Sequence, residues 1–272
     1  MSKTTTIILI AIMSFFSGCK KPVTRIDYEN PDVKVLFLHH STGRNVWFGD
    51  VEQKKLYLKE ETCMVPRLIK EYNDRTGKKV AIEERYFPSG NPYAWKNYPF
   101  DYYNIWVKNA GETPYMEEPT LEMLTKDYGI IIFKHCFPVS KVLADDNNPD
   151  INSEVKTLSN YKLQYEALRE KMIQFPNTIF IVWTGAVLVE SQLTPEDAKR
   201  AEEFYKWVKE SWDVPGDNIE LFDFRALETE GGLYLKPEYA VGKDDSHPNI
   251  KLGTIAAEAF AKRIIEVIEM NQ

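Results

Sequence analysis

One serine and one histidine, far apart in the chain, are the residues whose types and surroundings suggest joint chemistry. Ser41 lies just beyond a strongly apolar segment that ends at Leu38, and His247 lies in the run Asp244-Asp245-Ser246-His247-Pro248-Asn249. A serine hydroxyl becomes a good nucleophile only when a base removes its proton, and an imidazole base needs an acceptor on its second nitrogen. We therefore expect Ser41 as nucleophile, His247 as base and Asp244 as the carboxylate that orients it.

Each of these residues also has a purely structural interpretation. Ser41 can be a helix cap or part of a strand-to-helix turn, Asp244 a solvated loop acid or a cap, and His247 a turn histidine before Pro248. The elements around them decide between the two interpretations.

The rest of the chain alternates between strand and helix patterns. The segment 33–38 is an apolar run with β-branched residues, typical of a strand covered on both faces. Similar segments occupy 80–87, 129–135, 177–184 and 218–224. Helical patterns occupy 62–76, 152–174, 195–212 and 250–269, and Thr194-Pro195 and Gly77 are typical helix start and stop signals. This alternation predicts right-handed βαβ units and a parallel sheet in one three-layer α/β domain.

Ligands of such sheets bind beyond the carboxyl ends of the strands. The predicted ends carry Ser89-Gly90-Asn91 after the second strand and His135-Cys136 after the third. All four histidines fall at this edge: His39, His40, His135 and His247. The sequence therefore predicts one site at this edge.

The combination resembles the SGNH (GDSL-type) hydrolase family. That family has its nucleophile in a Gly-Asp-Ser motif after the first strand, and His39-His40-Ser41 occupies this place with only the serine retained. Its last motif, Asp-x-x-His followed by Pro-Asn and a helix with a glycine, is matched by Asp244 to Asn249 and Gly253. The resemblance implies a flavodoxin-like sheet in the order 2-1-3-4-5 and a serine esterase that needs no cofactor.

The resemblance also implies an oxyanion hole, with one departure. Its donors are the amides of Ser41 and Gly90 and an asparagine side chain, whose place Cys136 takes by simple counting. A thiol is a weak donor, and losing one oxyanion donor costs on the order of 10²–10³ in rate. His135 or His40 could replace it, although Cys136 and His135 could equally be core residues.

A metal centre is the alternative chemistry for the same residues. His39, His40, His135 and Asp244 are acceptable zinc ligands. However, adjacent residues of a strand point to opposite faces, and the chain has no His-x-x-x-His or Cys-x-x-Cys spacing. We expect no metal.

An aromatic stretch over 86–106 is the clue to the substrate. Flat aromatic faces suit sugar rings. This suggests a glycan or an acylated small molecule as substrate, with His40, Asn91, Tyr93 and Trp95 as candidate binding residues. Alternatively, most of these rings pack a long insertion onto the domain. The function that competes with an esterase is a carbohydrate-binding protein on the same fold whose oxyanion hole has decayed.

The N-terminus resembles a bacterial lipoprotein signal. Lys3 precedes an apolar run over 7–16 that ends in Phe16-Ser17-Gly18-Cys19, similar to a lipobox. We expect a signal peptide over 1–18, lipidation at Cys19, a tether over 19–31 and the hydrolase-like domain over 32–272. The protein would then sit in the bacterial cell envelope and touch the membrane only through its lipid. An ordinary secretory signal with an accidental cysteine is the alternative.

Composition excludes several classes of protein. With 43% hydrophobic residues the chain can build a globular core, and a net charge of −7 argues against nucleic acid as a partner. Three cysteines are too few for a disulfide scaffold, so we expect Cys63 and Cys136 to be buried free thiols.

Overall fold

The computed structural model describes residues 24–51, 62–94, 96–146 and 148–271. Its centre is a five-stranded sheet in the order β2-β1-β3-β4-β5, and all neighbouring strands are parallel. The strands are β1 (Val33–His39), β2 (Val80–Tyr86), β3 (Ile130–Phe133), β4 (Ile179–Trp183) and β5 (Ile219–Phe222). The predicted fold class and strand order are confirmed.

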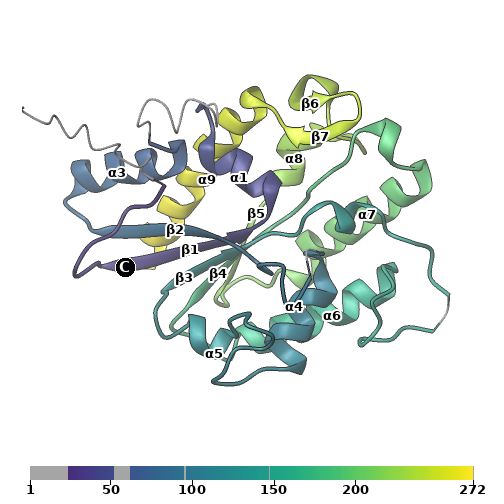
Figure 1. The fold of residues 1–272 in the computed structure, drawn as a ribbon, viewed down its shortest axis with the longest axis horizontal. Helices are drawn as coiled ribbons and strands as arrows, with labels where there is room; N and C mark the ends of the chain where they lie inside the picture. Colours follow the sequence, from purple (N-terminus) through teal and green to yellow (C-terminus); the bar gives the residue numbers. More distant parts are fainter. Residues whose placement is uncertain (1–23, 52–61, 95, 147, 272) are drawn as a thin grey trace, which may run out of the picture.

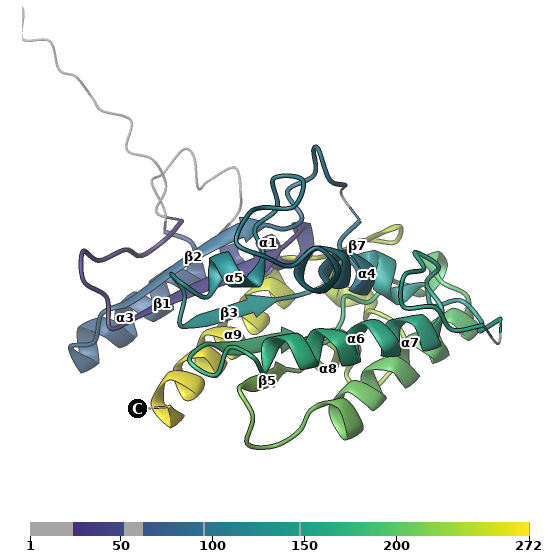
Figure 2. The same ribbon diagram turned by 90° about the horizontal axis from the view of Figure 1, so that it is seen from below.

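Helices cover both faces of the sheet (Figures 1 and 2). One layer consists of α1 (Ser41–Phe48), α3 (Met64–Thr76), α8 (Phe224–Thr229) and α9 (Ile250–Met270). The other consists of α4 (Pro99–Tyr103), α5 (Leu121–Leu124), α6 (Leu158–Met172) and α7 (Pro195–Trp207). The result is a three-layer sandwich.

Strand β1 shows why the sheet is buried on both sides. Val35 and Phe37 pack into the core beneath α1, α3 and α9, whereas Leu36 and Leu38 pack into the core beneath α4, α6 and α7. All four side chains have no exposed surface. Side chains alternate between the faces of a strand, so a continuous apolar run is what a doubly covered strand requires.

The predicted helices are present, with shifted ends and some additions. Thr194 caps α7 through a hydrogen bond from the Asp197 amide, and Gly77 ends α3 in a left-handed conformation, as the sequence signals predicted. The helix predicted over 152–174 begins only at Leu158. Sequence patterns did not predict α1 or a small hairpin of antiparallel strands, β6 (Ala240–Gly242) and β7 (Asp245–Pro248).

The described residues begin at position 24, inside the segment expected to be a tether. Ile26 forms an antiparallel bridge with Ile82 of β2, with N···O distances of 3.0 and 2.8 Å. The predicted signal peptide and Cys19 lie outside the described residues. Cys63 and Cys136 are buried free thiols, as predicted.

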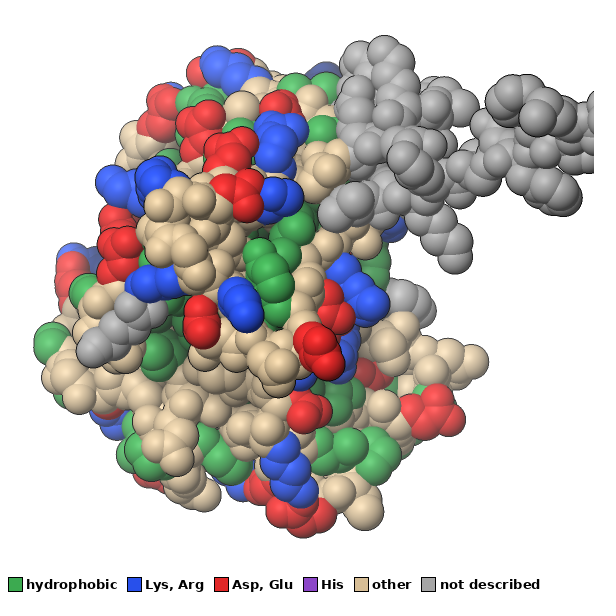
Figure 3. All heavy atoms as spheres, turned by 90° about the vertical axis from the view of Figure 1, so that its left-hand side faces the viewer, with side chains coloured by type: hydrophobic (Ala, Val, Ile, Leu, Met, Phe, Trp, Pro, Cys, Tyr) green, Lys and Arg blue, Asp and Glu red, His purple; other side chains and the backbone are tan. Residues whose placement is uncertain are grey.

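Lysines, arginines and acidic residues are interspersed on the face shown in Figure 3. Among the residues that the structure describes, no helix is long and apolar enough to cross a membrane.

Candidate active site

Ser41, His247 and Asp245 form a hydrogen-bonded chain. The Oγ of Ser41 lies 2.8 Å from Nε2 of His247, and Nδ1 of His247 lies 2.6 Å from Oδ1 of Asp245. Ser41 and His247 are 206 positions apart in the chain. The geometry is that of a nucleophile, a base and an orienting carboxylate.

Ser41 owes its position to a tight connection between β1 and α1. It is the first residue of α1, directly after His40, which takes the extended N-cap position. A Cβ on Gly43 would lie 2.5 Å from Cβ of His39. Glycine at this position therefore lets the first turn of α1 fold back onto the end of β1 and brings Ser41 to the edge of the sheet.

His247 is presented by a strand, and this corrects the predicted carboxylate. Asp245 and His247 are two apart in β7, so their side chains lie on the same face of that strand. Asp244 precedes the strand, and its Oδ1 accepts a hydrogen bond from Ser191 at 3.1 Å. The partner of His247 is therefore Asp245 and not Asp244, because the motif is extended here and selects the residue at spacing two.

Hydrogen bonds from the rest of the motif attach β7 to its surroundings. The Asn45 amide of α1 donates to the Pro248 carbonyl at 2.9 Å, which connects the helix that carries Ser41 to the strand that carries His247. Asn249 caps α9 and donates to the Glu238 and Ala240 carbonyls. The Ser246 hydroxyl accepts from the Val189 amide at 2.9 Å. These hydrogen bonds give Ser246, Pro248 and Asn249, the neighbours of His247 in the motif, a structural role.

Gly253 has a packing role in the same region. A Cβ at this position would lie 3.1 Å from the Asn45 carbonyl oxygen and 3.2 Å from that of Gly49. Its glycine therefore lets α9 approach α1 closely, which brings the two halves of the site together.

The charge state of Asp245 suits its position. Hydrogen bonds from the amide and ring of His247 hold the pKa of this carboxyl below its usual range. Its side chain is 49% exposed and that of His247 is 35% exposed. The ring of Phe137 also packs edge to face against the imidazole of His247, with 5.1 Å between the ring centroids. An ionised carboxylate accepting from Nδ1 leaves Nε2 as the nitrogen that accepts the serine proton.

The expected oxyanion donors are only partly in place. Ser41 stands in the first turn of α1, where amides have no partner within the helix and the helix dipole favours negative charge. The Gly90 amide is used differently from the prediction, because it hydrogen-bonds the buried carboxylate of Glu118 together with Ser89. Burial raises the pKa of Glu118, and these hydrogen bonds lower it in part.

His135 and Cys136, the predicted replacements for the missing donor, are both buried. His135 is fully buried among the rings of Tyr102, Phe133 and Tyr165, and neither ring nitrogen has a hydrogen-bond partner among the described residues. Burial holds its pKa well below the usual value. The Cys136 amide donates to the Asn97 carbonyl at 3.0 Å, and its side chain is buried. The oxyanion roles of His135 and Cys136 stay predictions, and the burial of both side chains argues against them.

His39 and His40 have structural partners as well. Nε2 of His40 lies 2.7 Å from the Pro88 carbonyl oxygen, and burial lowers the pKa of His40 to about 4. Nε2 of His39 lies 2.6 Å from Oε2 of Glu84. Within the described segments no three His, Cys, Asp or Glu side chains form a group that could hold a metal ion. His40 therefore contacts the loop after β2, and it is not among the residues that line the pocket beside His247.

Most of the aromatic stretch is core, which was the alternative to a sugar-binding role. Residues of this stretch that are buried are Phe87, Tyr98, Phe100, Tyr102, Tyr103 and Trp106. The Tyr93 hydroxyl accepts from Asn104 at 3.0 Å, and its ring packs against this core. Asn91 is exposed, and Trp95 lies outside the described residues.

Sequence reasoning missed Lys134, which is fully buried next to the nucleophile. Its Nζ donates to the Thr42 hydroxyl and, at 2.7 Å, to the His135 carbonyl. Burial lowers the pKa of this ammonium group. A lysine that ends an otherwise apolar strand is the signal that could have revealed it.

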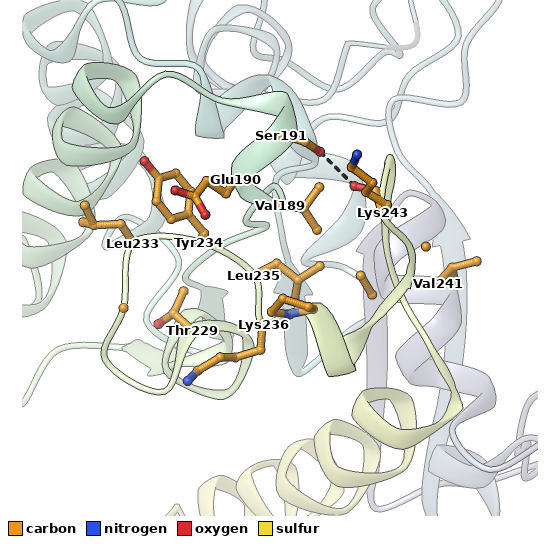
Figure 4. Close-up of a pocket in the computed structure, with 14 residues that line it drawn as sticks. Val189, Glu190, Ser191, Thr229, Leu233, Tyr234, Leu235, Lys236, Val241 and Lys243 are labelled. Atoms are coloured by element: carbon orange, nitrogen blue, oxygen red, sulfur yellow. Dashed lines mark hydrogen bonds between the residues drawn. The ribbon is translucent and has the colours of Figure 1, made fainter.

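Two pockets flank the segment after β4. The pocket at the triad has a volume of about 580 Å³, and Asp245, His247, Phe137 and Gln192 line it. The other, of about 630 Å³, is lined mainly by apolar side chains, with Ser191 donating to the Lys243 carbonyl at its rim (Figure 4). His247 and Asp245 line the first pocket and neither lines the second, so the first is the candidate site of chemistry.

No family model and no curated protein matches this chain. Solved structures do. An acetylxylan esterase from Geobacillus stearothermophilus aligns over 86% of this chain and 95% of its own, with 13% identity and a TM-score of 0.50. The chain has the SGNH hydrolase fold. In this SGNH fold, Ser41 follows the first strand and His247 precedes the last helix, as the resemblance implied.

Two further structures are similar at lower scores. A putative GDSL-like lipase from Parabacteroides merdae aligns over 89% of this chain and 98% of its own, with 13% identity and a TM-score of 0.48. A family two carbohydrate esterase from Clostridium thermocellum, in complex with cellohexaose, covers 90% of this chain and 67% of its own, with 12% identity and a TM-score of 0.43.

Proposed function

We propose that the protein is a serine ester hydrolase that removes acyl groups, acetyl foremost, from a carbohydrate. The observation that supports this proposal is the hydrogen-bonded chain from Ser41 through His247 to Asp245, with distances of 2.8 and 2.6 Å. It lies beside a pocket large enough for a sugar unit. The acetylxylan esterase with the same fold is consistent with it.

In this mechanism His247 takes the proton of Ser41 as Oγ attacks the ester carbonyl. The negative charge that develops on the carbonyl oxygen faces the free amides of the first turn of α1. The alkoxide of the sugar leaves with the proton held by His247, and an acyl-enzyme remains. Water then attacks the acyl carbon, with His247 again taking a proton, and releases the acid and the serine.

Covalent labelling at Ser41 tests the proposal. We expect a fluorophosphonate probe to label the wild-type protein but not Ser41→Ala, and the wild type to release acetate from acetylated xylo-oligosaccharides. A wild-type protein that neither reacts with the probe nor hydrolyses 4-nitrophenyl acetate would contradict the esterase.

A carbohydrate-binding protein without activity is the second candidate. The observation in its favour is that Glu118 engages the Gly90 amide and that Cys136 stands where the family has an asparagine. Such a protein would remain unlabelled by the probe, yet its melting temperature would rise with oligosaccharide.

We also propose that the protein is anchored in the bacterial cell envelope through lipid on Cys19. The support is the run of apolar residues ending in Ser17-Gly18-Cys19. Wild-type protein should partition into detergent, and Cys19→Ser should stay unprocessed or leave that phase. An uncleaved wild-type protein in the aqueous phase would contradict the anchor.

A further inference from the structure

Two lysines line the pocket beside His247. Lys141 follows the short helical turn Phe137–Ser140, and Lys156 precedes α6, so the two come from segments separated by a long loop. Lys141 is exposed and Lys156 is half-buried. Both lysines therefore line the same cavity as the base.

The backbone holds the two lysine-bearing segments together. The Leu143 amide donates to the Lys156 carbonyl at 2.8 Å, and Leu143 forms a parallel bridge with Thr157. Arg200 of α7 donates to the Val142 carbonyl at 2.6 Å. These contacts fix the spacing of the lysines before any ligand binds, which lowers the entropy cost of binding.

Neither lysine has an ionic partner among the residues that the structure describes. In the described parts of the chain, the side chains of Lys141 and Lys156 make no hydrogen bond or ion pair, whereas Lys96 and Lys171 each pair with a glutamate. Asp197 is near Lys156, but its carboxylate pairs with Arg200. Burial lowers the pKa of Lys156, and the neighbouring charge of Lys141 lowers it further.

The acidic residues of the pocket are held by other groups. Asp245 accepts from His247, and Asp244 accepts from Ser191. The charges of Lys141 and Lys156 therefore act on each other, while the nearby Asp197 is engaged by Arg200. An anion bound between the two lysines would relieve their repulsion.

We propose that Lys141 and Lys156 bind a carboxylate of the substrate, so that the preferred substrates are acylated glycans that contain uronic acids. This inference rests on the proposed esterase function, because it places the carboxylate in the pocket that His247 lines. We assign the carboxylate to the sugar, and the substrates below test this assignment against a carboxylate on the acyl group.

The experiment compares charged and neutral esters. Acetylated oligogalacturonides are compared with acetylated xylo-oligosaccharides, and 4-nitrophenyl hemisuccinate with 4-nitrophenyl acetate. The proteins are the wild type, the double variant Lys141→Gln/Lys156→Gln, and Lys262→Gln as a matched control. Lys262 is an exposed lysine of α9 outside this pocket.

We expect the double variant to lower the ratio of kcat/KM for the uronate ester over the neutral ester about tenfold, mostly through KM, since each partly exposed ion pair contributes modestly. The control should leave the ratio unchanged. If the double variant lowers only the ratio of kcat/KM for 4-nitrophenyl hemisuccinate over 4-nitrophenyl acetate, the carboxylate belongs to the acyl group and the uronate assignment is overturned. Unchanged ratios in both pairs would overturn the lysine site itself.

Binding to inactive protein separates this inference from the proposed function. Ser41→Ala should bind oligogalacturonide in calorimetry, and adding the two lysine substitutions should weaken that binding about tenfold. If the wild type hydrolyses no ester but this lysine-dependent binding is found, the esterase fails and the anion site stands. If the lysine substitutions leave the affinity for oligogalacturonide unchanged and melting temperatures show that the variants are folded, the proposed anion site is wrong.

Discussion

Nδ1 of His247 lies 2.6 Å from Oδ1 of Asp245, two residues earlier in the same strand, while the adjacent Asp244 hydrogen-bonds Ser191 instead. This pairing assigns different roles to two neighbouring aspartates. It also connects the base to a carboxylate on its own short strand, so the orientation of His247 depends on the hairpin that β6 and β7 form.

The two aspartates should differ sharply on substitution. Asp245→Asn removes the charge that orients His247 and stabilises its protonated form, so we expect kcat to fall by about 10- to 10³-fold. The half-exposed position of Asp245 favours the lower part of this range. Asp244→Asn, the matched control, should change kcat by less than about twofold. Steady-state kinetics on 4-nitrophenyl acetate measure both, and equal losses would contradict the assignment.

Ser41 and His247 should act as a unit. Ser41→Ala and His247→Ala should each lower kcat by at least about 10³-fold, and the double variant should lose little more, because either change stops the same proton transfer. Kinetics of the three variants make this comparison. Multiplicative losses, or an active Ser41→Ala protein that a chelator inhibits, would favour a metal centre instead.

His135 should be dispensable for catalysis. Its ring is buried, and neither nitrogen has a hydrogen-bond partner among the described residues, so His135→Leu removes unsatisfied polar atoms at similar volume. We expect the free energy of unfolding to rise by about 1 kcal/mol and kcat to stay within about twofold. Urea titration and kinetics test this together. A fall in kcat by about 10²-fold with unchanged KM would instead make His135 an oxyanion donor.

Glu228 should make the stability of the protein depend on pH. This carboxyl is fully buried, and burial raises its pKa from 4.5 to about 8, while the Val187 amide and Lys134 act in the opposite direction. Because the folded pKa is raised, the stability from the protonated group is complete below pH 4.5 and is lost as the pH rises to about 8.

The variant Glu228→Gln tests this dependence. Glutamine is neutral at every pH, so its gain in melting temperature relative to the wild type should be larger at pH 9 than at pH 5. Melting curves across this range make the measurement. Parallel curves for the two proteins would contradict the raised pKa, because they would mean that folded Glu228 is ionised throughout this pH range.

Local patterns carried most of the information about the fold. The apolar runs of β1 and β3 predicted strands buried on both faces, and the cap at Thr194 and the stop at Gly77 predicted two helix ends correctly. The helix α1 was missed because its residues, Ser41–Phe48, show no strong capping signal and only a short amphipathic stretch. Its position depends instead on the contact of Gly43 with His39.

The sequence by itself determined that Ser41 and His247 meet, because a parallel sheet brings the end of its first strand and the approach to its last helix to one edge. Only the tertiary structure decided which carboxylate serves His247 and where the other histidines point. The reason is that a strand period of two, set by the pairing of β6 with β7, selects Asp245 over Asp244. Likewise, burial among aromatic rings withdraws His135 from the site, and packing of this kind depends on residues distant in the chain.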